Sequence, residues 1–362
     1  MTDMIQINEN FVQQIPFLEK SFLDRSTDVF PELRDRLLKF SESLDLNHKE
    51  RLEEEYFGTG PLADIIEDAE INEIVINDHQ DIFYEKAGSW HQLDDHFLSP
   101  MTYKNFIQRL CHETGSKIDQ QEPFVCVKWE QFRAHITEES ISGVPCLCLR
   151  RHPNEHWNFK KLLDYDWCSD YQMELLQKCI EERNNILVVG ATGSGKTSFM
   201  NSCLDYIGVE DRCILLEDTD ELYVPNPLSV KLLARLKSSE NLPSISLGDL
   251  IHQSLRMRPD RLILGEARGA EAKDLLMAMA TGHSGSIASL HASNAQEAIL
   301  RLEMLIQLGA PHWSLEAIRR LILLSIQSII VVGKENGVRK LQGIWKIVSL
   351  EQFGLILQQL DR

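Results

Sequence analysis

Residues 190–197 have the types and spacing of a phosphate-binding loop. They read GATGSGKT, which matches the pattern G-x-x-x-x-G-K-[ST], and they directly follow the apolar run 186–189. A strand that ends in glycines and then opens a helix leaves backbone N–H groups facing one concavity, where the helix dipole favours negative charge. We therefore predict a nucleotide site here, the alternative being a glycine-rich turn that binds nothing.

Each residue type in this loop has a chemical reason to be there. Glycine lets phosphate oxygens approach the backbone, lysine supplies a mobile positive charge for the β- and γ-phosphates, and a threonine hydroxyl can ligate Mg²⁺. The residues expected to bind the nucleotide are Gly190, Thr192, Gly193, Ser194, Gly195, Lys196, Thr197 and Ser198, with Thr197 also expected at the metal.

Two acidic clusters follow segments that we predict to be strands. Glu217 and Glu221 come after the apolar residues 214–216, and Glu266 comes after 262–264. A nucleoside triphosphatase needs one carboxylate for Mg²⁺ and another to position the attacking water. Glu266 suits the metal, because its strand is expected beside the strand of the phosphate loop, and Glu221 or Glu217 suits the water. A carboxylate that is merely solvated at a strand end is the alternative for each.

Two histidines flank a third predicted strand. His283 precedes residues 286–290 and His291 follows them. Histidine can sense a γ-phosphate, but a hydrogen-bonded structural histidine fits the pattern nearly as well. Both interpretations stay open for each residue.

Composition limits the classes of protein that fit. With 362 residues we expect about two domains, and the net charge of −18 argues against direct binding of nucleic acid or anionic lipid.

The eight cysteines contain no C-x-x-C pair, so we expect reduced thiols and a cytosolic compartment. Cys146 and Cys148 alternate in a predicted strand and are expected to be small packing residues rather than metal ligands. No signal peptide is recognisable, and the apolar stretch 321–332 is too short to span a membrane.

The hydrophobic pattern divides the chain into four parts. Residues 1–55 are expected to form a helical extension, 56–155 a small α+β domain, 156–167 a linker and 168–362 an α/β domain. In the last part, strands alternate with helices, which predicts a mainly parallel sheet covered on both faces with its ligand at the carboxyl ends of the strands. Strands are expected at 71–77, 82–85, 132–136, 146–150, 186–189, 213–216, 230–233, 262–264, 286–290, 329–332 and 338–348, and helices at 102–111, 171–183, 198–206, 247–256, 270–280, 295–308 and 315–324.

At these residues the chain resembles the type II/type IV secretion and pilus-assembly ATPases. Four blocks match in order: GATGSGKTS, LLEDTDELYV, SLRMRPDRLILGEARGAEAKDLLMAMATGH and GHSGSIASLHASNAQEAILRLE. The phrases LRMRPDR, GEARGAEA and TGHSGS, with FGTGPLADIIEDAEINEIVIN upstream, are most similar to the branch that assembles tight-adherence (Flp-type) pili. The resemblance covers about residues 50–350, while the tetracysteine zinc motif of many type II secretion relatives is missing.

The resemblance implies a homohexameric ring that uses ATP and Mg²⁺. In it a PAS-like N-terminal domain and a RecA-like C-terminal domain clasp the nucleotide, and hydrolysis drives partners in the bacterial inner membrane from the cytoplasmic side. Carried over, Glu221 is the base that activates water, Glu266 is the Walker B carboxylate and His283 and His291 are the histidine-box pair, while Glu217 and Arg235 are expected among the nucleotide-binding residues.

The family also directs N-terminal arginines at the γ-phosphate. The best matches are Arg133 in FRAHI and Arg150 in CLCLRRHP, with Arg151 a close competitor, and a surface arginine is the alternative for each.

The function expected from all this is a cytoplasmic motor ATPase for pilus assembly or protein secretion, with an inner-membrane platform as partner and no direct contact with nucleic acid. A conjugation-type secretion ATPase, a RecA-like nucleic-acid translocase and a nucleotide-regulated scaffold are the alternatives.

Overall fold

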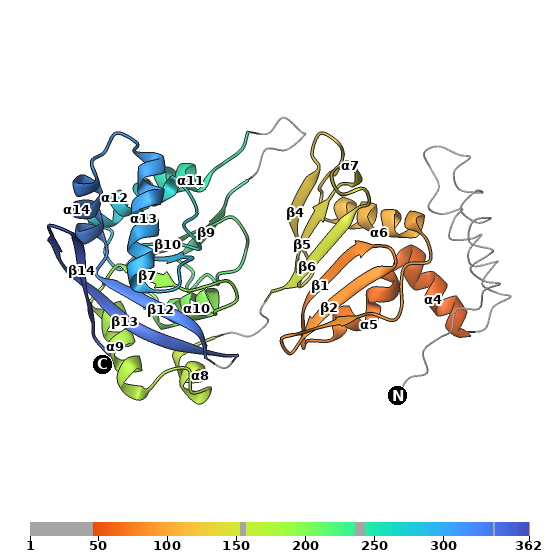
Figure 1. The fold of residues 1–362 in the computed structure, drawn as a ribbon, viewed down its shortest axis with the longest axis horizontal. Helices are drawn as coiled ribbons and strands as arrows, with labels where there is room; N and C mark the ends of the chain where they lie inside the picture. Colours follow the sequence, from red (N-terminus) through yellow and green to blue (C-terminus); the bar gives the residue numbers. More distant parts are fainter. Residues whose placement is uncertain (1–45, 153–156, 236–242, 336, 362) are drawn as a thin grey trace. The chain divides into compact units, whose positions relative to one another are not determined.

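The chain forms two compact units, which divide between His152 and Pro153 (Figure 1). The computed structural model describes residues 46–152, 157–235, 243–335 and 337–361. Within these residues no helix combines the length and the apolar character that a membrane span requires.

The first unit is a six-stranded antiparallel sheet with helices on one face. The strand order is β3-β2-β1-β6-β5-β4. Its strands are β1 (Ile71–Asp78), β2 (Asp81–Lys86), β3 (Ser89–Gln92), β4 (Phe124–Trp129), β5 (Phe132–Thr137) and β6 (Cys146–Arg151). Its helices are α4 (Leu46–Phe57), the 3-10 turn η1 (Gly60–Leu62), α5 (Ala63–Glu67), α6 (Pro100–Glu113) and α7 (Glu139–Ser142). Figure 1 shows α4 and α6 on the same side of the sheet.

Alternation along the strands decides which face is covered. Ile74, Phe132 and Leu147 are fully buried and pack in one cluster with Phe106 and Leu110 of α6. The residues between them point to the opposite face, because side chains alternate along a strand. The described helices of this unit do not cover that face, which we call the uncovered face. That face includes the two predicted arginines.

Helix α4 belongs to the first unit rather than to a separate extension. Its Leu52 and Tyr56 are buried, and the fully buried carboxylate of Glu55 accepts a hydrogen bond from the backbone N–H of Leu98 at 2.8 Å and from Arg51 at 2.7 Å. A buried carboxylate with these partners fixes the helix against the loop before α6. Residues 1–45 of the expected extension lie outside the described residues.

The second unit is an eight-stranded, mainly parallel sheet with order β14-β13-β12-β7-β11-β10-β8-β9. Strands β12, β7, β11, β10, β8 and β9 pair in parallel, and β13 and β14 add an antiparallel edge. The strands are β7 (Ile186–Val189), β8 (Cys213–Glu217), β9 (Val230–Leu233), β10 (Arg261–Leu264), β11 (Ile287–Leu290), β12 (Ser328–Glu335), β13 (Val338–Glu351) and β14 (Gly354–Gln359). The helices are α8 (Phe159–Asp164), α9 (Asp170–Glu181), α10 (Lys196–Tyr206), α11 (Leu247–Ser254), α12 (Glu271–Ala280), α13 (Ala295–Gly309) and α14 (Leu315–Ser325).

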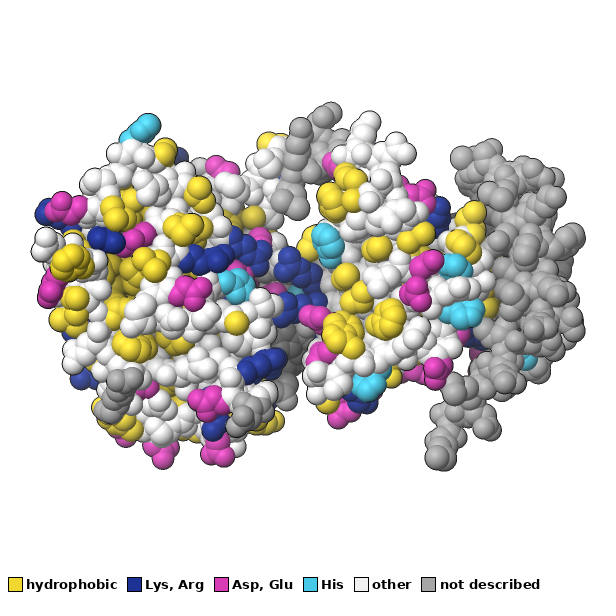
Figure 2. Space-filling view, viewed as in Figure 1, with side chains coloured by type: hydrophobic (Ala, Val, Ile, Leu, Met, Phe, Trp, Pro, Cys, Tyr) yellow, Lys and Arg dark blue, Asp and Glu magenta, His cyan; other side chains and the backbone are white. Residues whose placement is uncertain are grey.

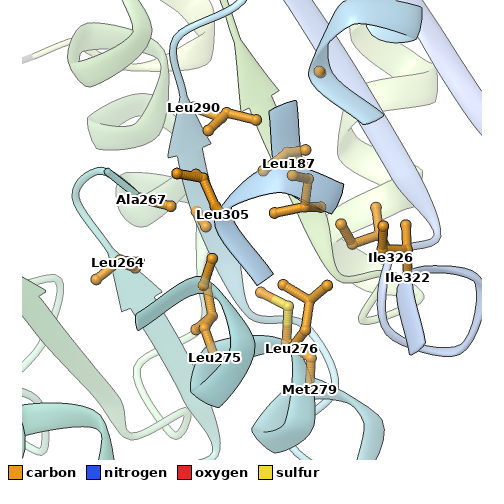
Figure 3. Packing of buried hydrophobic residues seen from close by; sticks show 14 of the residues in the cluster. Leu187, Leu264, Ala267, Leu275, Leu276, Met279, Leu290, Leu305, Ile322 and Ile326 are labelled. Carbon is orange, nitrogen blue, oxygen red and sulfur yellow. The ribbon is translucent and has the colours of Figure 1, made fainter. Parts of the chain in front are cut away.

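Both faces of this sheet are buried. In β7, Leu187 and Val189 join the cluster formed with α11 to α14, whereas Ile186 and Val188 join the cluster formed with α8 to α10. Figure 3 shows the first cluster, with Leu276 and other side chains of α12 packed against the strands. The continuous apolar runs of these strands are typical of a parallel sheet covered on two sides. The predicted fold class, a mainly parallel α/β domain with a smaller α+β domain before it, is confirmed.

The range 156–167, expected as a linker, differs from that expectation where it is described. It contains α8, and Phe159, Leu162 and Trp167 are buried in the core of the second unit. Helix α8 has only six residues, which is too short to show a helical period in the sequence. It was therefore not predicted. Strands β3, β4 and β14 were also not expected from the sequence.

The amino end of the central strands is held by a buried arginine. Arg261, which is 4% exposed, donates to Asp211 at 2.8 Å and to the carbonyl oxygens of Gly285 at 3.3 Å and Ile180 at 3.2 Å. A Cβ at Gly285 would lie 2.5 Å from this guanidinium, and Gly285 has φ +85°. The guanidinium therefore fills the space that a side chain would need.

We expect Gly285→Ala to destabilise the protein far more than Gly337→Ala does. Gly337 has φ +83° in the same unit with nothing within 4 Å of its Cβ position, so Gly337→Ala adds only backbone strain, about 1–3 kcal/mol. Gly285→Ala also displaces a buried, ion-paired arginine, which adds about 3 kcal/mol. Urea unfolding of the full chain measures the difference, and equal losses for the two variants would contradict the role given to Arg261.

Candidate active site

The phosphate loop adopts a conformation that requires its glycines. Strand β7 ends at Val189 and α10 begins at Lys196, and between them Gly193 has φ +69° and Gly195 φ +98°. These values lie in the left-handed region that favours glycine. At Gly190, a Cβ would lie 2.5 Å from the carbonyl oxygen of Val332 in the neighbouring strand β12. The loop therefore has the shape expected of a phosphate cradle.

Lys196 lies over the loop and bridges it to a histidine. The residue is 8% exposed, and its Nζ donates to the carbonyl oxygens of Gly190 at 2.9 Å and Ala191 at 3.1 Å. Nδ1 of His291 lies 3.0 Å from the same ammonium group. Because a lysine ammonium can only donate, this contact requires Nδ1 to be the unprotonated nitrogen of the ring.

His291 in turn connects the loop to Glu266. Its Nε2 lies 2.8 Å from Oε1 of Glu266. Burial and the nearby charge of Lys196 lower the pKa of His291, which favours the neutral ring. A neutral ring with Nδ1 as acceptor carries its proton on Nε2, the nitrogen that lies 2.8 Å from Oε1 of Glu266, although this N–H and the carboxylate do not form a hydrogen bond.

The strand order explains this arrangement and corrects one expectation. The strand that carries Glu266, β10, was expected beside β7, but β11 lies between them. His291 follows β11 and therefore stands between Lys196, after β7, and Glu266, after β10.

Glu266 has a second partner that the sequence analysis did not name. Nη2 of Arg268 donates to its Oε2 at 2.6 Å, and Nη1 of the same guanidinium pairs with Asp218. Arg268 therefore connects the ends of β10 and β8. The signal that could have found it is its place two residues after Glu266 in the block GEARG.

Glu221 is held beside the first turn of α10. Its Oε2 accepts a hydrogen bond from Oγ1 of Thr197 at 3.1 Å. Asn201, which is 2% exposed on α10, donates to the carbonyl oxygen of Glu221 at 3.2 Å and accepts from the N–H of Tyr223 at 2.8 Å. Asn201 is a further residue that sequence reasoning missed, since a single asparagine in a helix gives no signal of its own.

Glu217 does not lie open to a nucleotide, which corrects its assignment as a binding residue. The carboxylate is 3% exposed and accepts hydrogen bonds from the N–H groups of Leu222 at 3.0 Å and Glu221 at 3.2 Å. Lys231 approaches it at 3.6 Å and also pairs with Asp220. Burial raises the pKa of Glu217 to about 7. Glu217 therefore shapes the loop that carries Glu221.

The remaining predicted residues of the second unit form no hydrogen bond or ion pair with Glu221, Glu266 or His291 within the described part of the chain. His283 bonds the carbonyl oxygen of Ala278 at 3.1 Å and precedes β11, whereas His291 follows it, so the two histidines stand at opposite ends of one strand. The guanidinium of Arg235 donates to the carbonyl oxygen of Pro243 at 3.0 Å. In the loop, Thr192 is exposed, and Ser198 accepts from Ser202 through its carbonyl oxygen at 3.0 Å.

The two predicted arginines of the first unit are cross-strand neighbours. Arg133 of β5 pairs in register with Arg150 of β6 and with Lys128 of β4. Arg150 is half exposed and lies 3.7 Å from Glu73, and Nε of Arg133 lies 3.2 Å from Sγ of Cys126. The sheet thus gathers a row of three cations on its uncovered face.

Arg151, the competing candidate, has a structural role. Its guanidinium donates to the carbonyl oxygens of Ile71 at 2.7 Å, Ile66 at 2.7 Å and Asp68 at 2.9 Å, and lies 4.5 Å from the ring centre of Phe132. These contacts occupy the side chain within the first unit.

The residues around the phosphate loop fit Mg²⁺ bound together with phosphates. Oε1 of Glu266 and Oγ of Ser194 are buried and accept no hydrogen bond within the described residues; His291 is close to the former, but not at a hydrogen-bonding angle. Such oxygens, with the Thr197 hydroxyl, are the donors that Mg²⁺ prefers, and it needs only one or two from the protein when phosphates supply others.

Within the described part of the chain, no group of three or more His, Cys, Asp or Glu is arranged to hold a metal by itself. The eight cysteines, all of them described, form no disulfide.

Comparison with known proteins assigns the family. Residues 55–332 match the model described as "Type II/IV secretion system protein". The chain belongs to this family. Its fold is that of the family, with an N-terminal domain and a P-loop domain, as the resemblance implied.

Three similar proteins show the range of this family. A putative conjugal transfer protein of Mycobacterium tuberculosis is 27% identical over 297 residues, which cover 80% of this chain and 84% of that protein. The type IV secretion system protein VirB11 of Brucella suis is 29% identical over 325 residues, which cover 80% of this chain and 89% of VirB11. The structure of the pilus retraction motor PilT with bound ADP is 23% identical with a TM-score of 0.56, and the match covers 82% of this chain and 80% of PilT. The last match shows the fold alone.

We expect the stability of the protein to depend on pH through Glu217. Its pKa is raised from 4.5 to about 7, so the folded protein binds this proton more tightly than the unfolded chain does. Between those two pH values the folded state binds more protons, and stability therefore falls as pH rises. Relative to Glu217→Gln, the native protein should lose about 1–3 kcal/mol between about pH 5.5 and about pH 8.

Glu217→Gln is the appropriate reference because an amide oxygen still accepts from the two loop N–H groups without carrying charge. Urea unfolding at each pH measures both proteins. Parallel pH profiles would show that Glu217 is ionised without cost in the folded protein.

Proposed function

We propose that this chain is a motor ATPase that converts ATP and water to ADP and phosphate. The observation that carries the proposal is the arrangement around Lys196: a phosphate cradle with Glu221 on the Thr197 side and His291 with Glu266 on the other. Catalysis of phosphoryl transfer consists mainly of positioning and charge neutralisation, and these side chains can supply both.

The proposed roles follow from the contacts. Lys196 binds the β- and γ-phosphates after releasing the loop carbonyls that it contacts here, and Thr197 and Glu266 hold Mg²⁺, which neutralises phosphate charge when bound. Glu221 accepts a proton from the attacking water, because its carboxylate contacts Thr197 in the first turn of α10, directly after the phosphate loop. His291 lies between Lys196 and Glu266 and positions Glu266. When Lys196 moves to the phosphates, His291 loses this contact and can change its orientation.

The proposed motor activity involves an assembly of several copies of the chain. We propose that the protein works as a homohexameric ring, in which Arg133 and Arg150 contact the γ-phosphate of bound ATP. Their support is the row of cations on the uncovered face of the first unit, since cations aligned on one face repel one another and are stabilised by an anion. Arginines in such a position are worth about 10³–10⁵ in turnover.

Two biological settings fit equally well. The phrases LRMRPDR, GEARGAEA and TGHSGS favour the assembly of tight-adherence pili, whereas the names of the M. tuberculosis and B. suis relatives favour conjugation or type IV secretion. In both, the chain would be a cytoplasmic protein at the inner face of a bacterial inner membrane, attached through platform proteins. A nucleic-acid translocase is disfavoured by the net charge of −18, and DNA-stimulated, strongly salt-dependent turnover would favour it instead.

We expect Glu221→Gln to separate binding from hydrolysis. The variant should bind Mg²⁺-ATP within about threefold of the native protein and release phosphate at least about 100-fold more slowly, since it loses only the proton acceptor. It should also accumulate as ATP-bound hexamers, which native mass spectrometry can count. The control is Glu210→Gln, an exposed glutamate outside this site, which should behave as the native protein.

Full turnover by Glu221→Gln would transfer the role of base to another carboxylate. Native protein that stays monomeric with nucleotide and releases no phosphate would overturn the proposed function itself.

We expect the two histidines to differ strongly. His291→Ala removes the group between Lys196 and Glu266 and should lower kcat about tenfold to a hundredfold. His283→Ala serves as the matched control, because that side chain bonds only a backbone carbonyl at the other end of β11 among its described contacts. Its kcat should stay within about threefold. Equal losses would mean that both histidines reach the phosphates in the assembled ring.

A further inference from the structure

The strand pair β12–β13 places two positive side chains against the phosphate loop. Nε of Arg339 donates a hydrogen bond to the carbonyl oxygen of Gly193 at 3.1 Å. A Cβ at Gly195 would lie 3.3 Å from Cδ of Arg339, and one at Gly193 would lie 3.9 Å from Nζ of Lys334. Both side chains therefore lie at the two left-handed glycines of the loop. The matched family range ends at residue 332, before either of them.

The strand pair is anchored where it meets the loop. Val332 and Leu341 are paired in register and buried in the core shared with α8 to α10, and the N–H of Leu341 donates to the carbonyl oxygen of Trp167 at 2.9 Å. Lys334 and Arg339 form the register pair two positions beyond this anchor. Figure 1 shows β12 and β13 running along the side of the second unit where α10 lies. The two cations are thus carried on a fixed support.

The charges in this region are unbalanced. Lys334 and Arg339 are exposed, and within the described residues neither forms an ion pair. Like charges directly opposite each other on paired strands are destabilising, and the amino end of α10 and Lys196 add further positive potential. An anion bound in the loop removes this repulsion.

We propose that Arg339 is a positioning residue of the phosphate loop and that Arg339 and Lys334 together supply positive charge, from the same chain, to the phosphates of the bound nucleotide. This inference rests on the proposed function and extends it to the strand pair. Through its Nε, Arg339 fixes the direction of the Gly193 carbonyl and thereby the orientation of the peptide groups beside it. Its remaining guanidinium N–H groups are available for phosphate oxygens.

The first test measures the loop without nucleotide. Hydrogen exchange of the amides at residues 193–196 should become faster in Arg339→Ala than in the full-length native protein. Arg339→Gln keeps an N–H donor for the Gly193 carbonyl and should exchange at a rate close to native. Unchanged exchange in Arg339→Ala would show that the loop does not need this contact, and the positioning role would be wrong.

The second test uses the number of phosphates as the readout. Binding of a non-hydrolysable ATP analogue, ADP and adenosine is measured by calorimetry with Mg²⁺ present. Arg339→Ala, Arg339→Gln and Lys334→Ala should each weaken binding of the ATP analogue about fivefold to thirtyfold, weaken ADP binding less and leave adenosine unchanged. Lys340→Ala, which removes a charge from the other face of the same strand, is the control and should bind like the native protein.

Lys196→Ala separates failure of this inference from failure of the proposed function. If Lys196→Ala loses nucleotide binding while the Arg339 and Lys334 variants bind within twofold of native, the inference alone is wrong. If Lys196→Ala binds the ATP analogue as well as the native protein does, the proposed nucleotide site is wrong.

Discussion

The buried ammonium group of Lys196 is the charge on which the arrangement of the active site depends. In the structure it is held by two carbonyl oxygens of its own loop and by a ring nitrogen of His291. A buried cation requires such partners, because burial without them costs several kcal/mol. A phosphate oxygen is an acceptor of the same kind, since it also takes a hydrogen bond from an ammonium group.

Much of the fold could be predicted from the sequence because the central strands are continuous apolar runs. Residues 186–189 and 230–233 were placed with the observed bounds, and the helix expected at 247–256 is observed as α11, which begins at the same residue. Short or weakly patterned elements were missed. β3 is exposed along its whole length, and β14 is an antiparallel edge strand, so neither has the buried period that identifies a strand.

The site was predicted in part, for a reason that lies in topology. Motifs indicate which residues stand at strand ends, but the order of strands decides which ends are neighbours. His291 and Glu266 meet because β11 lies between β7 and β10, while His283 stands at the other end of β11. Glu217 shows a second limit: a carboxylate at the end of a strand looks the same in sequence whether it faces a ligand or, as here, the backbone of the following loop.

The surface of the second unit contains another feature that the sequence indicates only in part, a row of exposed apolar side chains on α13. Leu300, Met304 and Leu308 recur every four residues on α13 and are 58%, 69% and 68% exposed. Figure 2 shows hydrophobic side chains among polar ones over this part of the unit. Nothing in the described chain covers these three side chains. Their spacing in the sequence predicts an apolar helix face but does not predict what packs against it.

Asn201 connects two parts of the site, helix α10 and the loop that bears Glu221. Its side-chain amide donates to the carbonyl oxygen of Glu221 and accepts from the N–H of Tyr223. Asn201 lies on α10, the helix whose first turn contains Lys196 and Thr197. These two hydrogen bonds connect α10 to the loop that bears Glu221, so they restrain the distance between Glu221 and Lys196. The position of the Glu221 loop is therefore set by the same helix that follows the phosphate loop.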